Sequence, residues 1–261
     1  MEPPWENGPQ RIEHLITERS EAREILAFYQ SLLLFQKNLF ESLGQASLSG
    51  SLSRDLPVLA SQLGTFLRWV CDKGSILLRS QAYEIVEWQS HRKEGLLLSY
   101  WHGEAIAGGN FFPRAFLQTY AAFLAQHRIA IPGRGGTKDG CPFCGAAPQM
   151  AILQSAPAGA GGEGAKRFLV CSLCFTHWPI NRCSCARCKE VDPDKLPYYH
   201  SEQLPAVRVE ACETCRTYLK GIDLTKDGRA VPLVDEIATP ALDLWAHENG
   251  YTKVELNLAG I

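Results

Sequence analysis

The sequence has no long hydrophobic run and no export signal. Its longest apolar clusters, residues 32–35 and 96–98, fall far below the roughly 18 to 20 apolar residues that a membrane span requires. The first six residues, Met1 to Glu6, contain no basic segment followed by an apolar one, which a secretory signal needs. We therefore expect a cytoplasmic protein without stable membrane insertion.

The motifs of the common catalytic frameworks are also missing. The sequence contains no P-loop, no G-x-G-x-x-G, no G-x-S-x-G and no H-E-x-x-H. A basic excess is missing as well, since the formal net charge is −2, whereas nucleic-acid-binding domains usually carry clustered positive charge. These absences predict a protein that is not an enzyme and has no nucleic-acid partner.

The first half of the chain shows the spacing of amphipathic helices. Apolar residues recur three and four positions apart, which places them on one helical face. The pattern predicts a long helix from about Ser20 to Gly44 and shorter helices over about 56–71, 75–90 and 112–130. We expect Gly74, the segment around Gly95 and Gly108-Gly109 to separate them.

The second half has a different character. A glycine-rich stretch at residues 132–136 marks a domain boundary near residue 135. Short β-like runs follow at 150–153, 167–170 and 206–209, each beside a pair of cysteines; residues 156–164 are predicted as a loop and 233–247 as a closing helix. The fold class is thus α+β, with an α-helical domain (1–135) followed by two small four-cysteine metal modules of the zinc-ribbon kind (136–180 and 181–261).

Four cysteine pairs carry the strongest chemical signal. Eight of the 10 cysteines form pairs with the same two-residue gap: Cys141/Cys144, Cys171/Cys174, Cys185/Cys188 and Cys212/Cys215. Such a gap lets the backbone curl into a knuckle that aims both thiolates at one ion, and two knuckles complete a tetrahedral four-sulfur shell. Gly145 suits the positive-φ position that such a turn often uses. The sequence therefore predicts two ions, each held by four cysteines.

The loops between the pairs favour sequential pairing. Residues 145–170 separate the first two pairs and residues 189–211 the last two, and both loops are longer than the roughly 15 to 20 residues of a common ribbon. Loop closure nevertheless costs less entropy for neighbours in sequence than for interleaved pairs. Four thiolates suit zinc or iron equally, so the metal stays open.

The other cysteines and the histidines carry less weight. Cys183 is a spare ligand, a reactive thiol or a bystander, and Cys71, within an apolar helix, is best explained as a small core residue. The histidines are scattered, and only His177 lies near a cysteine pair. Sites filled by four protein ligands leave no open position for substrate, so we expect no catalytic residues.

The flanks of the cysteine pairs resemble those of the formate dehydrogenase accessory protein family, FdhE. The resemblance covers about residues 140–250 and depends on these segments: Cys141-Pro142-Phe143-Cys144-Gly145, Cys171-Ser172-Leu173-Cys174 with Trp178, Cys185-Ala186-Arg187-Cys188, residues 212–220 and residues 235–243. The N-terminal half agrees only in its helical character. Cys183 and the last residues depart from the family pattern.

The resemblance implies a cytoplasmic maturation factor. Such a protein would contact the catalytic subunit of a molybdenum- or tungsten-dependent formate dehydrogenase before export or assembly. It implies two rubredoxin-like modules behind a helical domain, with iron associated with them and the eight paired cysteines as ligands. The rival interpretations are a rubredoxin-like electron-transfer protein and, less favoured by the charge, a zinc-ribbon nucleic-acid binder.

Overall fold

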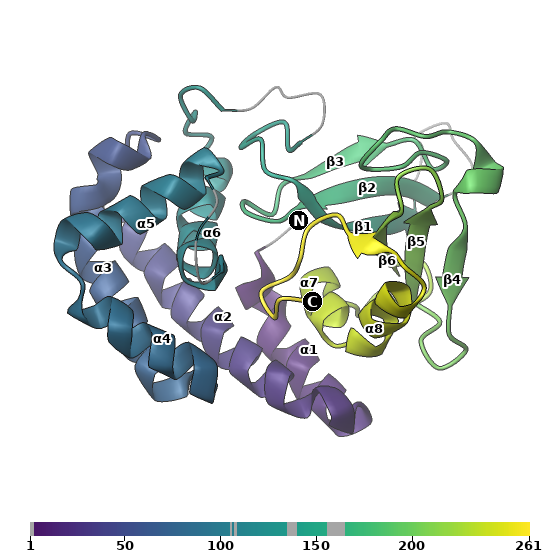
Figure 1. Ribbon diagram of the computed structural model, residues 1–261, viewed down its shortest axis with the longest axis horizontal. Helices are drawn as coiled ribbons and strands as arrows, with labels where there is room; N and C mark the ends of the chain where they lie inside the picture. Colours follow the sequence, from purple (N-terminus) through teal and green to yellow (C-terminus); the bar gives the residue numbers. More distant parts are fainter. Residues whose placement is uncertain (1–2, 105, 107–108, 135–139, 156–164) are drawn as a thin grey trace.

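Helices fill the first half of the chain and one mixed sheet most of the second, side by side (Figure 1). The computed structural model describes residues 3–104, 106, 109–134, 140–155 and 165–261. The expected boundary near residue 135 and the expected loop at 156–164 lie outside these residues. The α+β fold class predicted from the sequence is confirmed.

Among the described residues, six α-helices build the helical half: α1 (Pro4–Glu18), α2 (Arg23–Leu43), α3 (Leu52–Lys73), α4 (Ile76–Glu87), α5 (Ser90–His102) and α6 (Phe111–Gln126). The predicted helices correspond to α2, α3, α4 and α6. Helix α6 is the centre of this half, because every residue from Phe112 to Leu124 is buried. A helix that is buried on all sides has to be surrounded by other elements.

Two helices differ from the sequence prediction. The segment around Gly95 was expected to separate helices, which is wrong, because Gly95 lies within α5. A glycine in a helix costs about 1 kcal/mol relative to alanine, and burial of Leu97 and Trp101 on the same helix offsets that cost. Helix α1 was not predicted; Pro4 starts it, and Trp5 anchors it in the core.

The sheet runs through both cysteine modules. Its order is β3-β2-β1-β6-β5-β4, with β7 beside β6. The bounds are β1 (Pro148–Ser155), β2 (Ala165–Cys171), β3 (His177–Ile180), β4 (Tyr198–His200), β5 (Val207–Cys212), β6 (Thr217–Asp223) and β7 (Thr252–Lys253). The three predicted β runs correspond to β1, β2 and β5. Strands β1 and β6 pair in parallel, from Met150 with Lys220 to Leu153 with Asp223, so the strands of the two modules share one sheet. The three-domain division at residues 135 and 180 stays a prediction.

Two short helices, α7 (Pro232–Ile237) and α8 (Pro240–Glu248), stand where one closing helix was expected. The break falls at Thr239-Pro240, because proline lacks the N–H that a continuous helix would need. The Thr239 hydroxyl donates to the carbonyl oxygens of Asp235 and Glu236, 3.0 Å away in each case. Helix α7 also contacts the helical half. Nε of Arg11, on α1, donates to both carboxylate oxygens of Asp235, at 3.0 and 3.1 Å.

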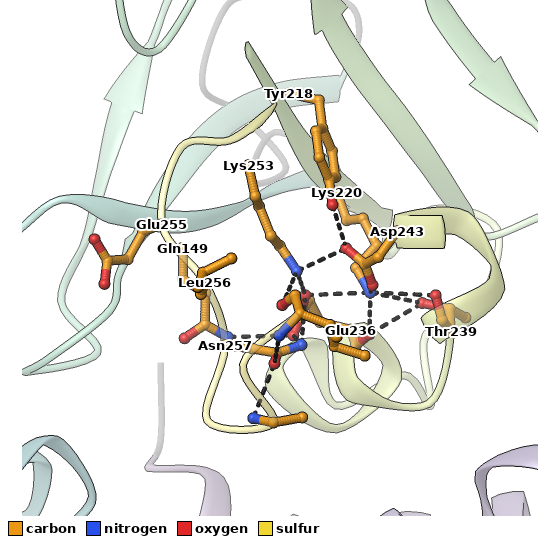
Figure 2. A network of polar contacts seen from close by, with 12 residues as sticks. Gln149, Tyr218, Lys220, Glu236, Thr239, Asp243, Lys253, Glu255, Leu256 and Asn257 are labelled. Carbon is orange, nitrogen blue, oxygen red and sulfur yellow. Dashed lines mark hydrogen bonds and ion pairs between the residues drawn. The ribbon is translucent and has the colours of Figure 1, made fainter. Parts of the chain in front are cut away.

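Two lysines and two carboxylates form a buried network between the sheet and these short helices (Figure 2). Lys220 Nζ lies 3.2 Å from Glu236 Oε1, and Lys253 Nζ lies 2.8 Å from Asp243 Oδ1. Each lysine also contacts the other carboxylate. Burial of unpaired charges would cost several kcal/mol each, but here the charges balance.

The surroundings change the acidity of this network. Burial alone would raise the pKa of Glu236, but Lys220 and Lys253 outweigh it and hold that pKa at about 2. Burial lowers the pKa of Lys220. The network continues into the helical half, because Gln149 donates to Glu236 at 3.3 Å and Arg114 of α6 donates to Gln149 at 2.7 Å. One polar chain thus ties α6, β1, β6 and α7 together.

The substitution Glu236→Gln tests this network. It leaves two buried lysines with one carboxylate, so we expect the free energy of unfolding at pH 7 to fall by about 3–5 kcal/mol. The folded pKa lies below the ordinary value of 4.5, so the wild-type stabilisation is complete above that pH and is lost as the pH falls toward 2.

Urea unfolding followed by tryptophan fluorescence would measure the deficit from pH 7 down to the lowest pH at which both proteins stay folded. The deficit should shrink below pH 4.5, and Glu202→Gln, at an exposed position, should show none. A deficit that is independent of pH would contradict the assigned role of Glu236.

Candidate metal centres

The first cluster brings together Cys141, Cys144, Cys171 and Cys174. The Sγ atoms of Cys141 and Cys174 lie 3.6 Å apart, and those of Cys144 and Cys171 lie 3.4 Å apart. All four side chains are buried. The first two pairs in the sequence therefore meet, as loop closure favours.

The second cluster brings together Cys185, Cys188, Cys212 and Cys215. The Sγ atoms of Cys185 and Cys215 lie 3.7 Å apart, and those of Cys188 and Cys212 lie 3.6 Å apart. The four sulfurs lie within 4.8 Å of one another, as in the first cluster.

These separations fit a four-sulfur metal shell. A disulfide would place its sulfurs about 2.05 Å apart. A tetrahedron with metal–sulfur bonds of about 2.3 Å has sulfur–sulfur edges of roughly 3.8 Å, close to the separations in both clusters. Each cluster could therefore hold one zinc or one iron ion, and such an ion would supply the positive charge that lets four thiolates share one small volume.

The turns that present the cysteines follow one local design. The residue after the second cysteine of each pair has positive φ: Gly145 (76°), Phe175 (60°), Lys189 (65°) and Arg216 (53°). Only glycine adopts this conformation freely, and other residues accept a strain of about 1–3 kcal/mol. The sequence signalled the turn at Gly145 alone, because the other three residue types give no indication of it.

Backbone amides support the sulfurs in these turns. Cys171 Sγ accepts from the amides of Leu173 and Cys174 at 3.3 and 3.4 Å. In the second cluster, Cys185 Sγ accepts from the amides of Arg187 and Cys188 at the same distances. Such donors stabilise the charged thiolate.

Two threonines that lie next to the sulfurs were not among the site residues predicted from the sequence. Thr176 Oγ1 lies 3.2 Å from Cys174 Sγ, and Thr217 Oγ1 lies 3.1 Å from Cys215 Sγ. A hydroxyl can donate to a metal-bound thiolate and fix its orientation. Each threonine stands two positions after the last cysteine of its cluster, and this repeat is the sequence signal that would have found them.

The two clusters differ in exposure. The first lies against the helical half, where Phe175 packs on Trp5 with ring centroids 5.9 Å apart and Gln118 of α6 donates to the Ser172 carbonyl at 2.9 Å. In the second cluster, Cys188 is exposed and Cys215 is half-buried. The second cluster therefore has an edge open to solvent.

The remaining candidates lie outside both clusters. Cys183 is exposed and is in neither group. Cys71, expected as a small core residue, is half-buried on α3 and packs against the hydrophobic core. His177 packs against Phe168, with ring centroids 5.5 Å apart.

The fold and clusters define the class: a protein with a helical half and a sheet that presents two four-cysteine centres. Residues 140–182 match the family described as "FdhE, central domain", and residues 182–259 match "FdhE, C-terminal domain". Residues 140–259 of the chain therefore contain the central and C-terminal domains of the FdhE family. None of the helices in the described residues is both long enough and apolar enough to cross a membrane.

Relatives agree with this assignment. "Protein FdhE homolog" of Aquifex aeolicus (strain VF5) is 39% identical over 150 residues, which are 58% of this chain and 51% of that protein. "Protein FdhE" of Escherichia coli (strain K12) is 30% identical over 141 residues, 52% of this chain and 43% of that protein. The chain thus spans about half the length of the curated relatives it matches.

A solved structure shares the fold. The crystal structure of the FdhE protein from Pseudomonas aeruginosa superimposes with a TM-score of 0.71 at 21% identity, covering 97% of this chain and 94% of that one. The likeness in fold therefore extends over the helical half, which the two family models leave out.

The difference in exposure predicts an order of metal release. In protein reconstituted with two zinc ions, a chelator should remove the ion of the second cluster at least about tenfold faster, because Cys188 is accessible while opening the first cluster requires local unfolding. Absorbance of a zinc-sensitive chelator would measure two phases.

Mass spectrometry after brief alkylation would assign the phases. We expect modification of Cys183 first, then Cys188 and Cys215, and the first cluster last. The Cys183→Ser variant is the control and should keep both phases, and a single phase in both proteins would contradict the inequivalence.

Proposed function

We propose that this protein is an accessory factor for a formate dehydrogenase, which binds the catalytic subunit of that enzyme in the cytoplasm and is needed for its assembly or activity. The match of residues 140–259 to the FdhE family domains supports this proposal, and the observation that carries it is the closed geometry of both clusters. Four cysteine sulfurs fill each shell, so no ligand position stays open for substrate, as catalysis by a metal would require.

In this proposal the eight cysteines bind two ions that act as structure. Cys171 ends β2 and Cys212 ends β5, so each shell clamps the end of a strand to a second turn. Because such a site does not exist in the unfolded chain, the free energy of metal binding becomes free energy of folding. The clamped strands then hold a rigid surface for the enzyme subunit.

The substitution Cys171→Ser tests the structural role. It removes one ligand of the buried first cluster, so we expect the metal content to fall from two equivalents to one and the thermal midpoint to drop by at least about 10 °C. Elemental analysis and calorimetry on protein purified without oxygen would measure both. The matched control is Cys71→Ser, outside the clusters, and full metal content in Cys171→Ser would defeat the claim.

Binding of the enzyme subunit needs a separate experiment. The full-length chain should co-purify with a co-expressed formate dehydrogenase catalytic subunit, and the Cys171→Ser variant should recover much less of it. If the wild-type protein, folded and metal-loaded, recovers none, the proposed accessory role is wrong.

The open edge of the second cluster favours a second candidate function, electron transfer to or from the enzyme subunit. A redox centre has to lie near the surface to exchange electrons with a partner, and Cys188 is exposed. This function requires iron. Iron-loaded protein should then show a reversible reduction wave whose potential shifts in Thr217→Val, because Thr217 contacts Cys215 Sγ at 3.1 Å. A zinc-only preparation from iron-replete cells would exclude it.

A further inference from the structure

A large cleft separates the first helices from the C-terminal segment. Its volume is about 1070 Å³, slightly above the roughly 300–1,000 Å³ typical of ligand pockets. Helices α2 and α4 form one wall, and the segment from Lys253 to Gly260 forms the other. In Figure 1 the yellow C-terminal segment faces the helical half across this region.

The helical wall of the cleft is apolar and partly uncovered. Phe28 of α2 and Leu78 of α4 line it, both half-buried. Leu77 of α4 also lines it and is 68% exposed, and its neighbour Ile76 is 90% exposed. Adjacent exposed aliphatic side chains on a helix typically mark a contact surface for another polypeptide.

The basic residues of the cleft are already neutralised. Arg114 pairs with Glu255 at 3.3 Å, and Lys73 pairs with Asp72 at 2.9 Å. Lys253 belongs to the buried network, where two carboxylates balance it (Figure 2). None of these cations is left to attract an acidic partner.

The acidic residues at the rim of the cleft differ from these basic residues in their ion pairing. Glu21 and Glu24, at the start of α2, line the cleft and are exposed. Within the described part of the chain, neither carboxylate forms an ion pair. The cleft therefore combines an apolar wall with two exposed carboxylates at its rim.

We propose that this cleft binds one segment of the formate dehydrogenase catalytic subunit, an amphipathic segment with apolar side chains on one face and Lys or Arg beside them. The inference rests on the proposed function and adds the surface and the chemistry of the contact. The apolar face packs on α2 and α4, as amphipathic helices pack in apolar grooves. The basic side chains meet Glu21 and Glu24, and this charge complementarity selects the partner.

Two sets of variants of the full chain test the proposal. Glu21→Lys with Glu24→Lys reverses the rim charge, and Leu77→Asp places a charge on the apolar wall. The matched controls lie outside the cleft at exposed positions: Glu202→Lys with Glu248→Lys, and Leu244→Asp. All six changed positions are exposed, so folding and metal content should match those of the wild type.

We expect the rim variant to bind the co-expressed subunit at least about tenfold more weakly, mainly through slower association, with the difference largest at low salt. Leu77→Asp should weaken binding by a similar factor through faster dissociation, independently of salt. The controls should bind as the wild type does. Surface plasmon resonance at two salt concentrations would separate these effects.

A labelled peptide provides a probe that does not depend on the enzyme subunit. An amphipathic peptide of Leu and Lys should bind the wild type and lose at least about tenfold in affinity with the rim variant, whereas a matched peptide of Leu and Glu should not bind. Fluorescence anisotropy would measure both.

The outcomes distinguish the two proposals. If the wild type binds the enzyme subunit and both cleft variants bind it equally well, the cleft assignment is wrong and the accessory function stands. If the wild type does not bind the subunit at all, the accessory function fails, and the assignment of this partner fails with it. If sedimentation shows a dimer that Leu77→Asp disperses, the cleft is a self-association face and the proposal is overturned.

Discussion

Repulsion between thiolates is the constraint on which the sheet half of this protein depends. In each cluster four sulfurs lie within 4.8 Å of one another, a spacing that charged thiolates tolerate only around a cation. The four positive-φ turns accept backbone strain to reach this arrangement. The strands around them are short, from two to eight residues, and have few residues with which to offset that strain. Metal binding is the source of free energy that fits the requirement.

The buried ion network has a different role, because it attaches the sheet to the helices. Hydrophobic packing is tolerant of small displacements, whereas paired charges fix their partners in one arrangement. Glu236 holds two lysines from different strands, and Gln149 passes the contact on to Arg114 of α6. The helical half and the metal half therefore have one preferred relative position, and the shape of the cleft between them depends on that position.

The sequence predicts the features whose signals are local. Identical cysteine spacing specified both clusters, and the apolar stripe from Ser20 to Gly44 specified α2, because a side chain's neighbours along the chain determine each pattern. Helix α5 was missed because tertiary burial of Trp101 outweighs the glycine at 95. Pro240 is itself a local signal for a helix break. The apolar periodicity continues across it, however, and therefore predicted one helix where the structure has two short ones.

The remaining features depend on segments that are distant in sequence. Nothing near Met150 or Lys220 indicates that they pair in parallel, and a lysine within a strand gives no sign that its partners lie on helices that follow it. The threonines beside the sulfurs are an intermediate case. Their position two residues after Cys174 and Cys215 is a local pattern, but its meaning became clear only when the Sγ distances were known.

The parallel pairing of β1 with β6 has a consequence for the order of folding. During synthesis β1 and β2 leave the ribosome long before β6, so one edge of β1 stays unpaired while about seventy further residues are made. Such an edge is a template for wrong pairing with another chain. A first cluster that closes early, from residues 141 to 174 alone, would shorten the disordered chain in that interval. Metal supply during translation would then decide how much of the protein avoids aggregation, independently of how stable the finished fold is.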